Sequence, residues 1–120
     1  MVTIKINGNE YNLACNLRVA YTLQGEHNHE SYTKILSRVG DMTLEQQIDI
    51  LYIAFKTANP GVAQSFTKEM FRAYIFDHDE FNATVLMQYI KKVISGILGK
   101  ALPDEDEQED SSVTEGAEKN

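Results

Sequence analysis

Two short histidine-containing clusters hold the residue types in this sequence that could do chemistry. His27, His29 and Glu30 supply two imidazoles and a carboxylate, which are groups that bind zinc in proteins. A zinc site needs further ligands at a matching spacing, and neither a Cys-x-x-Cys nor a His-Glu-x-x-His motif accompanies them. We therefore expect a polar loop between helices, with no metal and no cofactor.

The second cluster is Asp77-His78-Asp79, in which a His–Asp pair could move a proton to or from a substrate. Side chains adjacent in sequence usually point in different directions, so a helix break with Asp79 as the next N-cap is the better interpretation. Cys15 is the single cysteine and has no basic neighbour in its predicted strand to lower its pKa, so we interpret it as a small buried hydrophobe. We therefore expect no catalytic residue and no enzyme activity.

The acidic residues are concentrated at the C-terminal end. The 120-residue chain has a formal net charge of −7. Residues 103–120 hold eight acids and one lysine, whereas residues 1–102 hold ten acids and ten bases. A neutral body without clustered Lys and Arg does not favour nucleic-acid binding. The acidic segment has almost no apolar residues, so we expect a disordered tail that either only adds solubility or engages or shields a partner site.

The sequence shows no signal for a membrane or an oxidising compartment. No apolar stretch approaches the ~18 residues of a membrane span, and no basic region followed by an apolar run opens the chain. One cysteine cannot form an internal disulfide. We therefore expect a cytoplasmic protein.

A β-hairpin is predicted over residues 2–15. Apolar and polar residues alternate on both sides of Asn7-Gly8, which is typical of half-buried strands. Asn7-Gly8 favours a type I′ turn because both residues tolerate positive φ, although a Gly8-Asn9 loop would shift the register. The alternating apolar positions are Val2, Ile4 and Ile6 before the turn and Tyr11, Leu13 and Cys15 after it.

Five helices are predicted after the hairpin, from apolar residues at helical spacing and from capping residues. Asn16 is a candidate N-cap for the first helix, and Gly25 is a candidate stop. Thr43 opens the third helix with a capping box, because Gln46 lies three residues later. The predicted ranges are 17–24, 30–39, a third helix from Thr43 to the Asn59-Pro60-Gly61 stop, 67–76 and 80–98.

The third helix should lie at the centre of the fold, because apolar residues occupy more than half of its circumference. The predicted inward positions are Leu17, Ala20, Tyr21 and Leu23 in the first helix, Leu44, Ile48, Leu51 and Phe55 in the third, and Met70, Phe71, Tyr74 and Ile75 in the fourth. The predicted fold is α+β and mainly α, with an N-terminal β-hairpin packed on a bundle of about five helices. Residues 1–102 form the predicted domain.

The last predicted helix carries candidate partner-binding residues. Tyr89, Val93 and Ile97 form one apolar line at i, i+4 and i+8, and a second line lies beside it. A single helix in a small domain can hardly bury both lines, so we expect one line to be left for a partner or a second copy of the chain. The second line consists of Leu86, Ile90 and Ile94.

Residues 3–13 read Thr-Ile-Lys-Ile-Asn-Gly-Asn-Glu-Tyr-Asn-Leu and lead directly into Leu-Arg-Val-Ala-Tyr-Thr-Leu at residues 17–23. With a helical region of about 80 residues and a charged tail, this opening resembles the tail assembly chaperones of long-tailed bacteriophages. In that family an Ile-x-Ile-Asn-Gly-x-x-Tyr hairpin precedes a short helix and a helical body. The matching residues are Ile4, Ile6, Asn7, Gly8 and Tyr11.

The resemblance implies a non-enzymatic role in the host bacterial cytoplasm. These chaperones bind the tape measure protein, a very long helical chain, and keep it soluble until tail tube subunits polymerise around it. The family often makes a longer product by ribosomal frameshifting. A partner helix held in an apolar groove is the docking mode that we expect, with neither nucleic acid nor membrane as a partner.

Two other classes of protein stay open as alternatives. One is a minor phage structural or connector subunit, which would persist in the finished particle. The other is an acidic regulator that binds and inhibits a host or phage protein. A regulator that mimics nucleic acid would need its acids arrayed on the folded body, whereas here they are concentrated in the tail.

Overall fold

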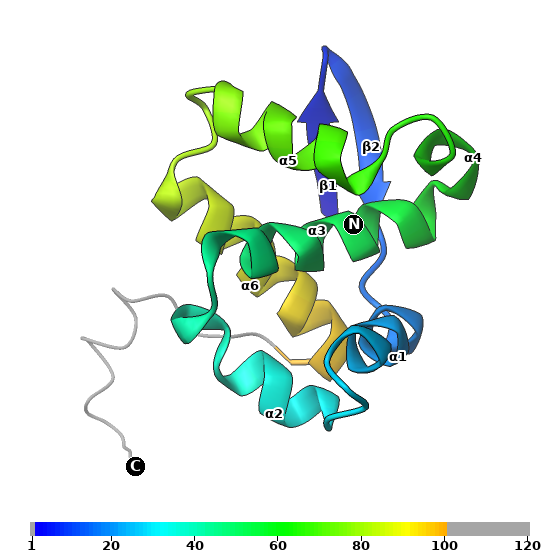
Figure 1. Cartoon of the computed structure of the whole chain (residues 1–120), viewed down its shortest axis with the longest axis vertical. Helices are drawn as coiled ribbons and strands as arrows, with labels where there is room; N and C mark the ends of the chain where they lie inside the picture. The colour runs from blue at the N-terminus through cyan, green and yellow to red at the C-terminus, as the bar shows by residue number, and fades with distance from the viewer. Residues whose placement is uncertain (1, 101–120) are drawn as a thin grey trace.

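The computed structural model describes residues 2–100, so the predicted tail at 103–120 and the predicted domain end at 102 lie outside the described residues. The described chain is α+β and mainly α, as predicted, with one antiparallel hairpin and six α-helices (Figure 1). The elements are β1 (Val2–Ile6), β2 (Asn9–Leu13), α1 (Leu17–Glu26), α2 (Tyr32–Ser37), a 3₁₀ turn (Val39–Asp41), α3 (Leu44–Ala58), α4 (Pro60–Ala63), α5 (Lys68–Asp77) and α6 (Ala83–Leu98).

The hairpin has the predicted turn. Asn7 and Gly8 have φ angles of 54° and 80°, and Ile6 pairs with Asn9, which together define a two-residue type I′ loop. The returning strand ends at Leu13, two residues before the predicted end. The chain leaves the ladder there because the next backbone N–H, that of Ala14, donates to the carbonyl oxygen of Ala54 in α3 at 3.0 Å.

Helix α1 begins where predicted and turns a different face inward. The Asn16 side chain accepts from the backbone N–H groups of the second and third helical residues, as an N-cap should. Gly25 does not stop the helix, which continues to Glu26. Leu17 and Tyr21 were predicted to face inward, but they are 65% and 68% exposed. The buried side chains of α1 are Val19, Ala20 and Leu23.

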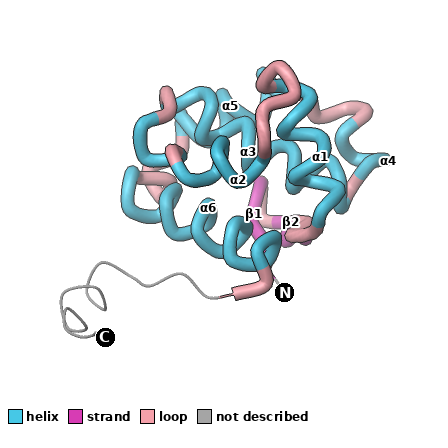
Figure 2. The backbone as a smooth tube through the Cα atoms, turned by 90° about the horizontal axis from the view of Figure 1, so that it is seen from below, coloured by secondary structure: helices cyan, strands magenta, loops and turns pink. Residues whose placement is uncertain are grey.

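Helix α3 is central, as predicted, and contacts β2, α1, α5 and α6. Two views at right angles show it running through the middle of the molecule (Figures 1 and 2). The capping box of Thr43 and Gln46 is present, and Phe55 packs within 6.0 Å of four other aromatic rings, measured between centroids. Leu44 departs from its predicted inward position and is 49% exposed, because it lies in the first turn, at the edge of the body.

The second half of the chain differs from prediction mainly at helix boundaries. Pro60 ends α3 but also begins the short α4, since its fixed φ suits a first helical position. Asn82 caps α6 instead of Asp79, because its side chain accepts from the N–H of Val85 at 2.9 Å. Met70 was predicted to face inward and is 48% exposed.

Candidate functional site

The structure places the predicted partner-binding residues of α6 in the core. This helix contacts β1, α1 and α3, so three elements cover it. The expectation that one apolar line stays open is therefore wrong for the described body, because buried side chains offer a partner no surface. Leu86, Ile90, Val93, Ile94 and Ile97 are all buried, and Tyr89 is half-buried against them.

The contact between α6 and the start of α1 is very tight. A Cβ atom added to Gly96 would overlap the Cβ of Cys15, so only glycine fits there. Burial raises the pKa of the Cys15 thiol, which lowers its thiolate fraction at neutral pH. This thiol is therefore in a packing position, and its environment does not activate it as a nucleophile.

The His27–Glu30 segment is a polar connection between α1 and α2, as predicted, but α2 covers Tyr32–Ser37 and not the predicted residues 30–39. Asn28 and His29 adopt left-handed backbone angles, with φ of 58° and 63°. Arg38 donates two hydrogen bonds to the Glu30 carboxylate, and these bonds lower the pKa of Glu30. Within residues 2–100, no group of three or more His, Cys, Asp or Glu is arranged to hold a metal ion.

His78 is engaged in local structure at the end of α5. Its ring stacks on that of Tyr74, with centroids 3.8 Å apart, and its Nδ1 lies 2.8 Å from the carbonyl oxygen of Tyr74. The Tyr74 hydroxyl in turn accepts from the backbone N–H of Asn7 at 2.9 Å. Tyr74 therefore links α5 to the hairpin turn, and His78 packs on Tyr74.

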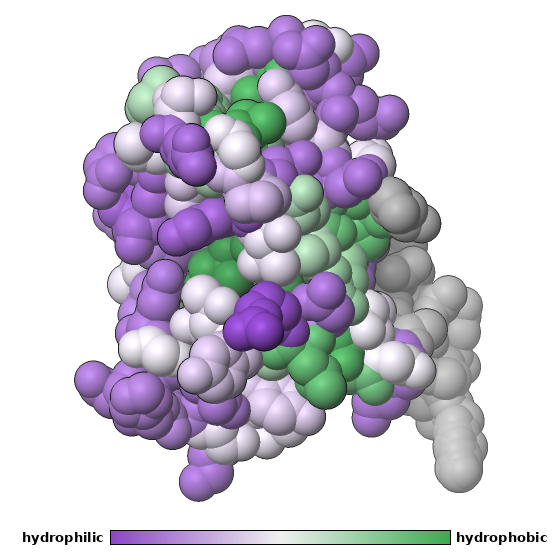
Figure 3. Space-filling view, turned by 90° about the vertical axis from the view of Figure 1, so that its right-hand side faces the viewer, coloured by the Kyte–Doolittle hydropathy of each residue, from purple (hydrophilic) through white to green (hydrophobic). Residues whose placement is uncertain are grey.

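A groove between α1 and the α3–α5 segment is the surface feature that sequence reasoning missed. It encloses about 530 Å³, and we call it the α1–α5 groove. Tyr52 and Ile53 are buried residues of α3 that form its floor. Figure 3 shows this side of the molecule, on which green hydrophobic and purple hydrophilic areas are interleaved. The remaining lining residues are Arg18, Thr22, Glu26, Lys56, Thr57, Pro60, Ala63, Thr67 and Lys68.

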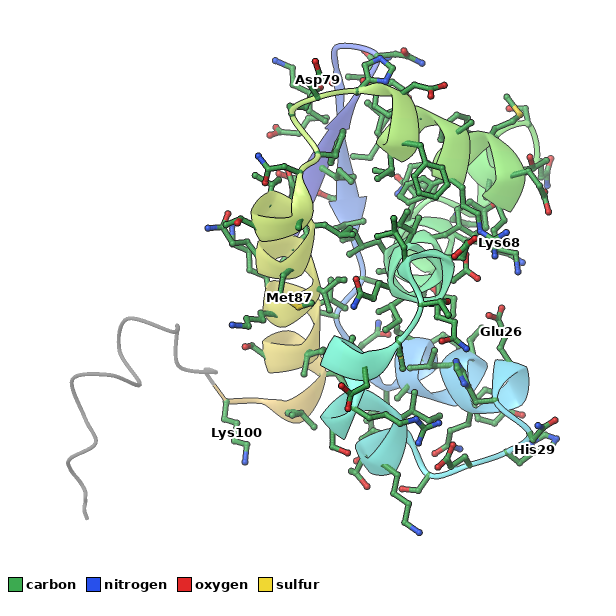
Figure 4. The ribbon with its side chains drawn as sticks, turned by 60° about the vertical axis from the view of Figure 1, so that its left-hand side comes forward. Glu26, His29, Lys68, Asp79, Met87 and Lys100 are labelled. Carbon is green, nitrogen blue, oxygen red and sulfur yellow. The ribbon has the colours of Figure 1, made fainter. Side chains whose placement is uncertain are left out.

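The rim of the α1–α5 groove carries excess positive charge. Arg18, Lys56 and Lys68 face one acid, Glu26. In residues 2–100 none of these three cations forms an ion pair; the two ion pairs found there join Arg38 to Glu30 and Arg72 to Asp49. Lys68 and Glu26 project on the same side of the molecule, from α5 and α1 (Figure 4). The groove thus combines an apolar floor with a cationic rim.

A second, polar hollow continues from the α1–α5 groove past Glu26 and Lys68, which line both. Asp49 in its wall pairs with Arg72 at 2.6 Å. This pair raises the pKa of Arg72, chiefly through its hydrogen bond to the carboxylate. Asp49, Glu30 and Arg38 in the wall of this extension therefore already have charged partners, in contrast to the three cations of the groove.

Exposed apolar side chains lie beside the groove on its flanking helices. Leu17 and Tyr21 occupy the face of α1 next to Arg18, whose guanidinium lies 5.7 Å from the Tyr21 ring centroid. Val62 of α4 is 37% exposed on the opposite side. A partner in the groove could extend onto these residues. Their exposure follows from the rotation of α1, which apolar spacing alone does not determine.

No helix among the described residues has the length and apolar character needed to cross a membrane.

The α1–α5 groove is the candidate functional site. Its floor comes from α3, and its cations are Arg18, Lys56 and Lys68. No family model, no curated protein and no solved structure matches the chain.

Proposed function

We propose that the protein is a phage tail assembly chaperone that binds a helical segment of the tape measure protein and keeps it soluble in the host cytoplasm until tail tube subunits assemble. The observation that carries this proposal is the α1–α5 groove, with its apolar floor and unpaired cations. The resemblance of residues 3–23 supports it, since these residues form a hairpin followed by a short helix.

The groove suits an amphipathic helix with acidic residues beside its apolar stripe. Helix α1 has ten residues and so extends ~15 Å, enough to lie along about three turns of a partner helix. The apolar stripe would lie over the groove floor and contact the exposed Leu17 and Tyr21 beside it, while acidic flanks would reach Lys56 and Lys68. Docking of a helix into a groove is a common way of recognising an exposed apolar stripe.

The charged rim favours reversible binding, which a chaperone needs and a permanent structural subunit does not. Ion pairs at an exposed rim contribute only ~0–1 kcal/mol each and weaken as salt increases. A complex held partly by Arg18, Lys56 and Lys68 can therefore release its partner when tube subunits compete for it. This supports the chaperone proposal over the connector-subunit alternative.

Co-expression with a phage tape measure protein tests the proposal. We expect the parent chain to raise the soluble fraction of that partner, and the double variant Lys56→Glu/Lys68→Glu to lose most of the effect. The matched control is Lys5→Glu/Lys34→Glu, which changes two exposed lysines outside the groove. Circular dichroism checks that both variants stay helical.

Two results would contradict the chaperone function. If the partner is equally soluble without this chain, no holding activity exists. If the protein stays in purified finished tails at a fixed stoichiometry, it is a structural subunit. If both double variants lose the same amount of the partner's soluble fraction, the protein still acts as a chaperone but binds its partner outside the α1–α5 groove.

A further inference from the structure

The unpaired cations of the α1–α5 groove have a counterpart within the same chain. Residues 103–120 hold eight acids and one lysine, and six of the acids fall between residues 104 and 110. We propose that this acidic segment docks on the groove in the free protein and occupies it until a partner displaces it. The docking itself stands on charge and geometry, while the displacement step rests on the proposed function.

The chain leaves the described body close to α1. Helix α6 ends at Leu98, and Gly99 closes it in a left-handed conformation with φ of 75°. One turn earlier, Gly96 packs against Cys15, the residue before the N-cap of α1. Figure 1 shows the end of α6 beside α1. The acidic segment therefore starts near the helix that supplies one wall of the groove.

The length of chain beyond Lys100 is sufficient to reach the groove. Extended chain spans at most ~3.3–3.6 Å per residue, so Asp104 can lie up to ~14 Å from Lys100. The whole of residues 101–120 could span ~66 Å, several times the ~15 Å length of α1. The acids at 104–110 can therefore pass around the start of α1 and run along Arg18, Lys56 and Lys68.

Tethering makes weak charge pairs effective. Single exposed ion pairs are marginal, but attachment through a short stretch of chain gives a segment an effective concentration on the order of millimolar. The acidic segment also has few apolar residues, so it covers the cations without filling the apolar floor. Such an occupant shields the groove from weak ligands and yields to a partner that contributes an apolar stripe as well.

The lysines of α6 offer a competing position for the acids. Lys91, Lys92 and Lys100 are close in sequence and form no ion pair within residues 2–100. They come from one helix and its end, whereas the groove gathers cations from α1, α3 and α5 around a concave surface. Clefts lined by one sign of charge concentrate the potential, and this favours the groove.

Zero-length carbodiimide coupling of the full chain tests the docking. The reagent joins a carboxylate to an amine only where the two touch, and peptide mapping by mass spectrometry identifies the pairs. We expect acids of 104–110 to couple to Lys56 and Lys68 several-fold more than to Lys5 and Lys34. This preference should fall several-fold between low and high salt, because screening weakens exposed charge pairs.

A pair of arginine variants sharpens the test. Arg18→Gln removes a groove cation and should reduce coupling at Lys56 and Lys68 several-fold. Arg38→Gln is the matched control, since Arg38 is already engaged by Glu30 and does not line the groove. A mixture of isotope-labelled and unlabelled chains shows whether the coupled acids and amines belong to one molecule.

Three outcomes would overturn the docking. Coupling centred on Lys91, Lys92 or Lys100 would place the acids on α6, and equal coupling at all lysines would mean no preferred surface. Mixed-isotope pairs would assign the groove to the tail of a second copy. The coupling is measured without any partner, so its result is independent of the co-expression test. Failure of the coupling test contradicts the docking, whereas failure of the co-expression test contradicts the chaperone function.

Discussion

Helices α1 and α6 both pack on α3, yet they differ in how much of their apolar surface is buried. α6 is the more apolar helix, and its apolar lines are covered by β1, α1 and α3. α1 buries only Val19, Ala20 and Leu23, leaves two large apolar side chains exposed and turns a polar face to the α1–α5 groove. The helix richest in apolar residues therefore lies in the core here, and the candidate binding surface lies where a moderately apolar helix packs along one face.

The largest expected effect is the loss of folding when a charge enters the buried face of α6. Val93 is 0% exposed, so Val93→Asp places a carboxylate where neither water nor a cation can reach it. We expect destabilisation of at least about 4 kcal/mol, enough to unfold much of a small domain. Urea denaturation followed by circular dichroism measures it, and a stable variant would mean that α6 is exposed in solution.

Two glycines provide a matched comparison of the same helices. Gly96→Ala in α6 places a Cβ against Cys15 and should cost about 1–3 kcal/mol, the usual range for overpacking. Gly25→Ala in α1 meets no atom of the described body within 4 Å outside its own helix, so it should stabilise by about 0.5–1 kcal/mol. Thermal midpoints of the two variants should move in opposite directions. The same sign for both would contradict the tight contact of α6.

A charge on the exposed face of α1 should hardly change stability. Leu17 is 65% exposed and occupies the first helical position, where a negative charge also suits the helix dipole. We expect Leu17→Asp to change the free energy of unfolding by less than about 0.5 kcal/mol. The partner's soluble fraction should nevertheless fall in co-expression. A large loss of stability would show that Leu17 belongs to the core.

The smallest expected effect is kinetic and concerns the junction between the two helices. Burial raises the pKa of Cys15 above its ordinary value of 9.0, so the reactive thiolate forms only at higher pH than in an exposed thiol. The rate of alkylation by iodoacetamide should therefore rise with pH later than that of a small-molecule thiol measured in parallel. A profile shifted to lower pH would instead indicate an activated cysteine.

Short-range features of the fold could be predicted from the sequence, because they depend on residues within a few positions of one another. The Asn7-Gly8 turn and the Asn16 cap are such features. Asp79 and Asn82 are both good caps, and the sequence could not rank them, since the choice depends on where α6 begins to pack. The same limit explains the error at α1, where two overlapping apolar faces fit helical spacing.

The candidate site could not be predicted for a related reason. Arg18 and Lys68 are 50 positions apart, and only the packing of α1 and α5 on α3 brings them to one groove. Helical periodicity describes one helix at a time and contains no information about that arrangement. The resemblance of residues 3–23 predicted a groove-binding protein, while it did not indicate which elements form the groove.

The contact between β1 and α6 joins the first and last elements of the described body, and it constrains when that body can fold. A two-residue-loop hairpin is at best marginally stable alone, and α6 begins 70 residues after β2 ends. At ~5–20 residues per second, a ribosome needs about 4–17 s to advance from the end of β2 to the end of α6. Throughout that interval Ile4 and Ile6 lack their final cover, so the newly made chain itself passes through an aggregation-prone stage.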